Sequence, residues 1–357
     1  MSEPSAPAPP PAAPPIQPIY LPPPRPRGRW WKRLLVGLLV ILLLFSILAN
    51  LGMGVLLAAF GSPGHLQQTV VEKGQEHQVV ALYRIGGLID ERAAATAERF
   101  YLDVRDNTAV KAVVLRVETP GGGVGASDRI NRIVANLKSK GKKVVVSMGS
   151  VAASGGYYVS AGADEIWAEP TTITGSIGVL ATLPVLTGTL QKIGVDMKVI
   201  RSSPTKAWKA VPDPFEQPAA YQIESLQQTL DAMQTRFEEV VKNGRGARLH
   251  VQPEATSQFA DAEGKNFSVT SAAPFNGKIY LPPEAMKLGL IDKIGYEEEA
   301  IASAASLANL TNPRVVQYAP VQSVFSALMS AKANPLIDAK VLDEVQTPNI
   351  MMIWKVE

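Results

Sequence analysis

The sequence AVVLRVETPGGGVGAS (residues 112–127) predicts the fold class of this chain. It begins as a buried strand, turns through consecutive glycines at 121–123, and enters a stretch with helical spacing of its apolar residues. A strand that leads through a tight turn into a helix is the repeating unit of parallel sheets. The glycines also present bare backbone N–H groups to an oxygen, whether of a carbonyl, a phosphate or an oxyanion. On these residues alone, a purely structural turn is an equally good explanation.

The same alternation of apolar strands and amphipathic helices extends to both sides of this unit. It predicts further strands at 79–85, 144–148, 165–168 and 197–200, helices near 92–105, 126–138 and 217–242, and a strand edge, short helix and turn within 276–295. Residues 244–275 are polar and weakly patterned, and no element is assigned to them. The pattern favours an α/β fold with a mainly parallel sheet and surrounding helices.

Residues 34–60, LLVGLLVILLLFSILANLGMGVLLAAF, carry no charge. A helix of this length spans about 40 Å, more than the ~30 Å hydrocarbon core of a bilayer. A secretory signal peptide normally has a shorter apolar core that starts near the first methionine. A buried globular helix would not stay apolar on every face for this length. We therefore predict a single transmembrane helix.

The flanks of the apolar stretch predict its orientation. Basic residues and Trp30 and Trp31 precede it within residues 1–33, whereas the near side after it holds only Glu72 and Lys73. The positive-inside rule then predicts a cytoplasmic N-terminus and an extracytoplasmic body, attached to the inner (plasma) membrane. Residues 1–28 are Pro-rich, which predicts a disordered tail, with docking of an SH3-like partner as the alternative. Residues 61–78 are interpreted as a connector.

Composition excludes several functional classes. The formal net charge of +3 over 357 residues is too small to predict nucleic-acid binding. The absence of cysteine excludes disulfides and thiol nucleophiles. The three histidines, His65, His77 and His250, lie outside any metal-binding spacing. No metal and no cofactor are expected.

Two further segments contain candidate catalytic residues. GSVAASGGYYVSAGAD (149–164) follows a strand, and there Ser154 could expose its hydroxyl at the edge of the sheet or simply cap a helix. Ser150 and Ser160 are less favoured, because paired glycines follow neither of them. TKAWKAVPDPFE (205–216) carries two lysines; they are either solvated or, beside an aromatic residue and prolines, desolvated enough for one to act as a base.

Six motifs in order resemble the signal peptide peptidase A family, which consists of serine-lysine peptidases with a fold similar to Clp protease and crotonase. The motifs are GGLID (86–90), ETPGGG (118–123), GSVAASGGYY (149–158), TTITGSIGV (171–179), KAVPDPF (209–215) and KLGLIDKIG (287–295). The resemblance implies a peptidase domain over residues 79–308. Residues 309–357 are left as a C-terminal extension of unknown role.

The resemblance also implies the roles of individual residues. Ser154 matches the nucleophile of the family. Gly121 and Gly122 match its oxyanion donors, although Thr119 replaces the usual serine, and Gly155 is assigned to the same oxyanion and substrate-binding set. Residues 174–178 match a segment that lines the substrate groove. Alignment backward from Pro214–Phe215 makes Lys209 the base, and alignment forward from 201–204 makes it Lys206; the gap-free match favours Lys209.

The function implied is hydrolysis of peptides at the membrane, such as cleaved signal peptides, by a homo-oligomer whose neighbouring protomers complete each active site. Two alternatives remain at this stage. A crotonase-like enzyme acting on acyl-CoA would share the fold, and an inactive scaffold that binds peptides would share the motifs.

Overall fold

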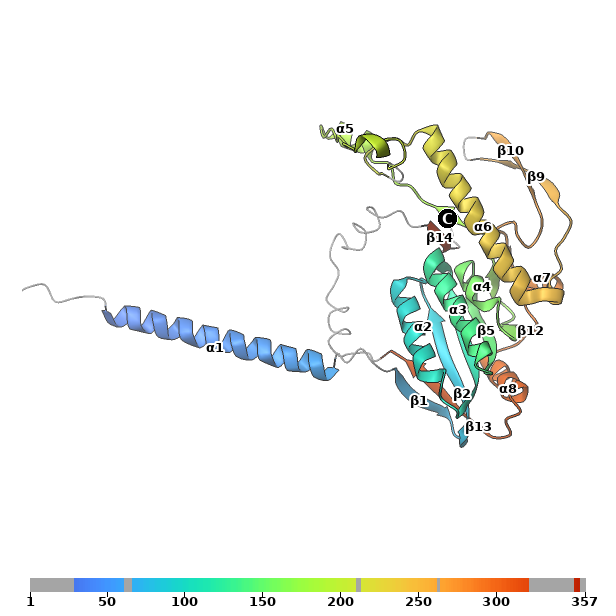
Figure 1. Cartoon of the computed structure of the whole chain (residues 1–357), viewed down its shortest axis with the longest axis horizontal. Helices are drawn as coiled ribbons and strands as arrows, with labels where there is room; N and C mark the ends of the chain where they lie inside the picture. Colours follow the sequence, from blue (N-terminus) through green and yellow to red (C-terminus); the bar gives the residue numbers. More distant parts are fainter. Residues whose placement is uncertain (1–28, 61–65, 210–212, 262–263, 321–349, 354–357) are drawn as a thin grey trace, which may run out of the picture. The chain divides into compact units, whose positions relative to one another are not determined.

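The computed structural model describes residues 29–60, 66–209, 213–261, 264–320 and 350–353. It divides into two compact units, residues 1–62 and 63–357. The described part of the first unit is one helix, α1 (Arg29–Phe60) (Figure 1). Its stretch Trp30–Gly52 is long and apolar enough to cross a membrane. The helix contains the predicted span 34–60 and begins five residues earlier, so that Arg29, Lys32 and Arg33 of the basic flank belong to its first turns. The predicted disordered tail, residues 1–28, lies outside the described residues.

The second unit is built on a nine-stranded sheet (Figure 1). Its main path runs in the order β1-β13-β2-β3-β5-β6-β12, and β7 branches from β5 and pairs with β11. The strands are β1 (Gln67–Glu72), β2 (Gln75–Gly86), β3 (Val110–Thr119), β5 (Lys143–Ala153), β6 (Glu165–Ala168), β7 (Ile173–Gly175), β11 (Ile279–Tyr280), β12 (Lys293–Ile294) and β13 (Pro313–Ala319). Only the pairs β1–β13 and β7–β11 are antiparallel. The expected α/β class with a mainly parallel sheet is confirmed.

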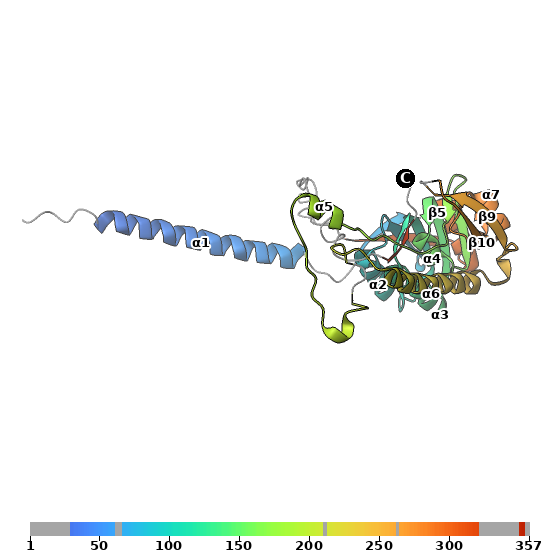
Figure 2. The same cartoon turned by 90° about the horizontal axis from the view of Figure 1, so that it is seen from above.

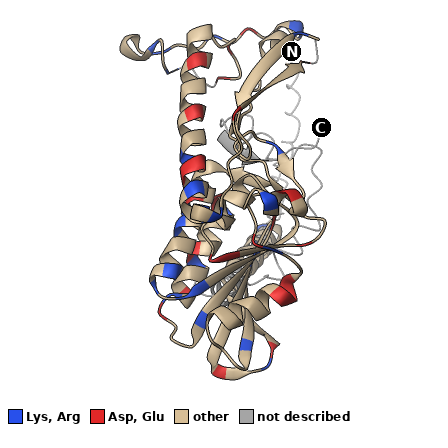
Figure 3. Ribbon diagram, turned by 90° about the vertical axis from the view of Figure 1, so that its right-hand side faces the viewer, with Lys and Arg blue, Asp and Glu red and all other residues tan. Residues whose placement is uncertain are grey.

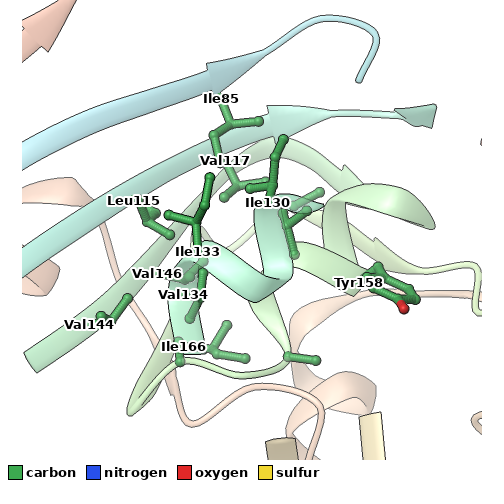
Figure 4. Packing of buried hydrophobic residues seen from close by; sticks show 14 of the residues in the cluster. Ile85, Leu115, Val117, Ile130, Ile133, Val134, Val144, Val146, Tyr158 and Ile166 are labelled. Carbon is green, nitrogen blue, oxygen red and sulfur yellow. The ribbon is translucent and has the colours of Figure 1, made fainter. Parts of the chain in front are cut away.

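Helices cover both faces of this sheet. The helices are α2 (Glu91–Val104), α3 (Val124–Ser139), α4 (Gly155–Ser160), α5 (Thr187–Lys192), α6 (Ala220–Arg245), α7 (Pro282–Lys287) and α8 (Glu297–Leu307), with short 3₁₀ turns η1 (Ser203–Thr205) and η2 (Gly246–Arg248). Successive residues of β3 point to opposite faces, as the pleat requires. Val113 and Leu115 join the larger core under α2, α3 and α4, whereas Ala112 and Val114 join the smaller core under α8. Figure 4 shows the larger core around Leu115, Ile130 and Val146.

Several elements differ from the sequence-based predictions. The predicted strand at 197–200 is wrong: these residues form no strand, and Ile200 is 84% exposed. Residues 244–275, left unassigned, contain the hairpin β9 (Ala255–Ala260) and β10 (Asn266–Ser271). The sheet is also wider than the predicted domain 79–308, because β1 comes from the predicted connector 61–78 and β13 from the predicted extension 309–357. These two strands pair with each other from opposite ends of the sequence, which no local pattern can indicate.

The long helix α6 is only partly covered. Figure 3 shows charged residues along it, and its buried residues lie mainly toward its C-terminal end, including Phe237, Val241 and Arg245. The side chain of Arg245 is fully buried and makes a two-pronged contact with Asp292, with Nη1 and Nη2 at 2.9 and 2.7 Å from the two carboxylate oxygens. Its Nε donates to the carbonyl of Gly289 at 2.7 Å. This ion pair joins α6 to the segment after α7.

Replacing Asp292 with asparagine is expected to lower the free energy of unfolding by about 3 kcal/mol, because it leaves the Arg245 guanidinium buried without a counter-charge. Thermal and chemical unfolding of the detergent-solubilised chain would measure this. The control is Glu239→Gln, which breaks an exposed pair with Arg236 and should cost less than about 0.5 kcal/mol. Equal effects of the two substitutions would contradict the assignment.

The Arg245–Asp292 pair makes the free energy of unfolding depend on pH. The direction of the pKa shift of Asp292 determines how. Burial alone would raise the pKa of Asp292, but the hydrogen bonds and charge of Arg245 outweigh it and hold that pKa below its usual value. The unfolded chain therefore binds the proton more readily than the folded one. The stabilisation is fully present above a pH of about 4 and is lost as the pH falls through the folded pKa.

Candidate active site

Ser154 lies at the junction between β5 and α4 in a strained backbone conformation. Its φ of 54° and ψ of −115° place it outside the regions that non-glycine residues favour. Such a conformation costs on the order of 1–3 kcal/mol and persists mainly at functional sites. The backbone is held by two hydrogen bonds: the Ser154 N–H donates to the carbonyl of Gly175 at 2.8 Å, and the Tyr158 N–H donates to the Ser154 carbonyl at 2.9 Å. The strand-to-helix turn predicted from the sequence is thus present, with strain added.

The Ser154 hydroxyl is not used by the helix that follows it. Ser154 is the N-cap residue of α4, yet its side chain makes no capping hydrogen bond. Its Oγ is buried and has no hydrogen-bond partner among the residues that the structure describes. An unpaired buried hydroxyl costs free energy unless a ligand or a reaction uses it. The explanation of Ser154 as an ordinary helix cap is therefore not supported.

The glycine segment forms a short strand, β4 (Gly121–Gly123), beside the N-terminus of α4. A Cβ added to Gly122 would lie 2.2 Å from the backbone oxygen of Ile89, and one added to Gly155 would lie 3.1 Å from the amide nitrogen of Gly122. No side chain fits at either position without a backbone shift. The glycines let β4 and the start of α4 approach closely, so the amides of Gly122 and Gly155 lie beside the nucleophile candidate.

The amide of Gly121 is already engaged. Its N–H donates to Thr119 Oγ1 at 3.0 Å, and its carbonyl accepts from the Ile89 N–H at 2.9 Å. Gly121 and Gly122, the two predicted oxyanion donors, both lie at the site. The N–H of Gly121 is used in the turn by its hydrogen bond to Thr119, whereas the N–H of Gly122 takes no part in that hydrogen bond. This difference between the amides of Gly121 and Gly122 is due to the hydroxyl of Thr119. In the sequence, Thr119 was noted only as a departure from the family motif.

Ser127 is a residue that the sequence reasoning did not single out. It lies in the first turn of α3, is fully buried, and its Oγ has no hydrogen-bond partner within the described ranges. A Cβ added to Gly155 would lie 2.7 Å from this oxygen, so the hydroxyl faces the start of α4. Its place at the end of ETPGGGVGAS was the only signal in the sequence. The site therefore holds two unpartnered hydroxyls, those of Ser154 and Ser127.

The tyrosines of GGYY anchor α4 in position. The Tyr157 hydroxyl donates to the carbonyl of Leu290 at 2.9 Å, and the Tyr158 hydroxyl donates to Asp128 at 2.6 Å. Burial raises the pKa of Tyr157 and of Tyr158 well above the usual value, so both phenols remain donors at neutral pH. Figure 4 shows Tyr158 at the edge of the core below α3. These hydrogen bonds fix the position of α4 and therefore the position of Ser154, which is its N-cap residue.

Residues 171–179 support the other element that positions Ser154, the end of strand β5. Thr174 Oγ1 donates to the carbonyl of Ala152 at 2.8 Å, and β7 pairs in parallel with the end of β5. Ser176 follows with a φ of 50° and is 8% exposed. The chain then leads into a second short strand, β8 (Leu180–Ala181). This segment thus pairs with the end of the strand that leads directly into Ser154.

The structure does not bring the candidate lysines to Ser154. Lys206 and Lys209 lie on the segment between α5 and α6, which leaves the body of the unit in Figures 1 and 2. Both are exposed, and neither ammonium group has a hydrogen-bond or ion-pair partner in the described part of the chain. Trp208, expected to help desolvate a lysine, is itself 65% exposed and contacts Tyr221. Residues 210–212 of the motif KAVPDPF lie outside the described residues.

Comparison with known proteins relates the chain to one family of peptidases. A model of Peptidase family S49 matches residues 136–311, a range that contains Ser154 and both candidate lysines. The chain is related to the S49 peptidases. The expected resemblance is confirmed, and with it the serine-peptidase class of the proteins that the chain resembles.

Proteins similar to this chain occur in distant organisms. The chain is 34% identical to Protease 4 of Haemophilus influenzae, over 65% of this chain and 34% of that protein. It is 29% identical to a putative signal peptide peptidase SppA of Enterococcus faecium, over 72% of each. It is 35% identical to the putative protease MJ0651 of Methanocaldococcus jannaschii, over 62% of this chain and 65% of that protein. The chain thus spans only a third of Protease 4.

Among solved structures, a membrane-bound stomatin-specific protease 1510-N in complex with a substrate peptide is 17% identical, with a TM-score of 0.38, over 71% of this chain and 97% of that one. ClpP1 of Listeria monocytogenes is 15% identical, with a TM-score of 0.35, over 62% of this chain and 94% of that one.

Proposed function

We propose that this chain is a membrane-anchored serine endopeptidase in which Ser154 is the nucleophile and a lysine is the general base. The observation that carries the proposal is the strained, buried Ser154 with an unpartnered Oγ beside the amides of Gly122 and Gly155. The family match supports it, because it includes this serine and both lysines.

The proposed reaction is acyl transfer. Ser154 Oγ attacks the peptide carbonyl while its proton passes to the neutral lysine, and the developing oxyanion accepts hydrogen bonds from backbone amides. The lysine then gives the proton to the leaving amine as the C–N bond breaks. Water attacks the acyl-enzyme and gives a proton to the same lysine, which returns it to Ser154 Oγ as the ester C–O bond breaks and the carboxylic acid product leaves. Because the Gly121 N–H is engaged by Thr119, we assign the oxyanion donors to Gly122 and Gly155.

We propose that the lysine reaches Ser154 from a neighbouring copy of the chain. In one protomer Lys209 and Lys206 are exposed on an outlying segment, whereas Ser154 is buried. A homo-oligomer in which this segment docks on the next protomer would supply the base and exclude water from it. Lys209 remains the favoured base and Lys206 the alternative.

The proposed substrates are extended peptides released near the membrane, such as cleaved signal peptides. One relative is named a putative signal peptide peptidase, which supports this class. A crotonase-like reaction on acyl-CoA is the second candidate from the sequence, and no observation on the structure favours it.

Labelling with a fluorophosphonate tests the proposal directly. The full-length chain in detergent, treated with the reagent and digested, should carry the label on the peptide that contains Ser154. Labelling at another serine, or none together with no peptide hydrolysis, would overturn the proposal. An inactive peptide-binding scaffold would give the second of these results.

Membrane attachment and orientation form part of the proposal, supported by the apolar stretch of α1 and the basic residues before it. A protease added outside intact spheroplasts is expected to digest the second unit and leave the tail and helix. Western blotting with tags at both ends would follow the fragments. Complete protection of the second unit, with digestion after lysis as the control, would contradict the orientation.

A further inference from the structure

Residues 201–209, between α5 and α6 (Figure 1), fold into a turn that carries both candidate lysines. The 3₁₀ turn η1 lies inside it, and the hydroxyls of Ser202 and Thr205 hydrogen-bond to each other at 2.6 Å. The N–H groups of Trp208 and Lys209 donate to the carbonyl of Thr205, at 3.2 and 2.9 Å. The backbone of this segment, which we call the lysine turn, is therefore ordered by its own hydrogen bonds.

The start of α6 holds the lysine turn from the outside. The Tyr221 hydroxyl and Gln222 Nε2 each donate to the carbonyl of Ala207 at 3.1 Å. The ring of Tyr221 also packs edge-on against that of Trp208, with 5.4 Å between the ring centroids. The two lysines of the turn are exposed nonetheless. The turn thus presents mobile side chains from a backbone that is held in place.

Arg201 clamps the end of the lysine turn. Its Nε donates to the carbonyl of Lys209 at 2.5 Å. Its Nη2 lies 3.1 Å from Asp213 Oδ2 and 2.8 Å from Glu216 Oε2. Only 11% of the Arg201 side chain is exposed. The planar guanidinium offers donors in several fixed directions and so can hold a carbonyl and two carboxylates at once, which a lysine ammonium group does less well.

These hydrogen bonds fix residue 209 on both sides of its Cα atom. Its N–H donates to Thr205 and its carbonyl accepts from Arg201, so the direction in which the side chain leaves the backbone is set. Lys206 is held less firmly, since its N–H lies 3.5 Å from the carbonyl of Ser203. A lysine side chain has many rotamers, and a general base needs a backbone placed precisely enough for its amine to reach one position.

We propose that Arg201 is a positioning residue for the general base: it fixes the lysine turn so that the amine meets Ser154 in one geometry. The inference rests on the proposed peptidase function, and it holds whether the turn docks within its own chain or on a neighbouring protomer. The donors of Arg201 are directed at its own turn, so its effect on hydrolysis passes through the lysine. Displacement of a reacting group by about 1 Å costs on the order of a hundredfold in rate.

The kinetic test replaces Arg201 in the full-length chain. Arg201→Gln should lower kcat for an apolar peptide about a hundredfold and leave KM within a factor of about two, because the residues around Ser154 are unchanged. Arg201→Lys keeps the charge without the fork of donors and should lower kcat about tenfold. The matched control Arg314→Gln breaks an ion pair with Glu76 and should leave both constants within a factor of about two. A kcat of Arg201→Gln within the range of this control would overturn the proposal.

A double-mutant cycle shows whether Arg201 acts through the lysine. Lys209→Ala already removes the base, so the addition of Arg201→Gln should change the remaining rate by less than about twofold. A general structural role of Arg201 would lower the remaining rate about a hundredfold again, and that result would overturn the proposal. If Lys206→Ala proves to be the inactivating substitution, it replaces Lys209→Ala in the cycle.

Mixed oligomers give a second readout of the same dependence. Arg201→Gln chains keep Ser154, and Ser154→Ala chains keep an intact lysine turn, so their mixture should regain about a quarter of the wild-type activity for random pairing. The mixture of Arg201→Gln with Lys209→Ala contains no intact turn and should stay at about 1% or below. Recovery in this second mixture would contradict the assigned role. So would failure of the first mixture where Ser154→Ala mixed with Lys209→Ala recovers activity.

The outcomes separate this inference from the proposed function. Absence of peptide hydrolysis by the wild-type chain overturns the peptidase function and the role of Arg201 with it. An active wild-type chain with an unaffected Arg201→Gln variant overturns the role of Arg201 alone.

Discussion

Replacement of Ser154 by alanine is expected to reduce peptide hydrolysis on the order of a millionfold, because the attacking oxygen is removed together with the hydroxyl proton that the base accepts. The fold should be kept, since Ser154 Oγ makes no hydrogen bond in the described structure that the folded state would lose. Initial rates with a fluorogenic apolar peptide, together with thermal unfolding, would measure both quantities. Ser150→Ala changes an exposed serine of the same motif and should leave activity within a factor of about two.

A comparison of Ser154→Gly with Ser154→Ala tests the strain separately from the chemistry. Both variants lack the hydroxyl and should be inactive. Glycine adopts the positive φ of 54° without the steric cost that alanine pays, so the glycine variant should be the more stable by about 1 kcal/mol. An alanine variant as stable as the glycine variant would indicate that the conformation at position 154 relaxes. Retained hydrolysis in either variant would remove Ser154 from the mechanism.

Replacement of Lys209 by alanine is expected to reduce hydrolysis by about four orders of magnitude, because no neutral amine then accepts the Ser154 proton. Lys206→Ala, three residues earlier on the same exposed segment, is the matched control and should retain most of the activity. The reverse result would move the base to Lys206.

Mixing two inactive variants tests whether the base comes from a neighbouring copy. Ser154→Ala chains keep the lysine, and Lys209→Ala chains keep the nucleophile. After dissociation and reassembly together, a protomer with Ser154 can lie beside a protomer with Lys209, and about a quarter of the wild-type activity should return for random pairing. Separate incubation of each variant is the control. No recovery in mixed oligomers would mean that both residues act within one chain.

The sequence by itself determined the α/β class and the central part of the sheet. The alternation of strands and helices from Val79 to Met148 is predicted correctly because the strands in this range are buried on both faces. A strand buried on both faces is a continuous apolar run, which can be recognised without knowing its neighbours in the sheet. The turn at Ser154 was predicted for a similar reason, since glycines and small residues mark it locally. Ile200, in contrast, belongs to an apolar run that the rest of the protomer leaves exposed, and the strand predicted there does not form.

Tertiary structure alone decided which polar groups at the site are free and which distant strands pair. The pairing of β1 with β13, and of β14 (Ile350–Ile353) with β4, joins segments more than two hundred residues apart. Hydrophobic periodicity contains no information about such partners. The engagement of the Gly121 amide by Thr119 and the unpartnered hydroxyl of Ser127 depend on distances of about 3 Å, which composition does not specify. The lysine motif was visible in the sequence, yet its segment lies away from Ser154 within one protomer. Local propensity and burial are properties of a short stretch of chain, whereas strand register, hydrogen-bond satisfaction and the approach of distant segments arise only when the whole chain packs.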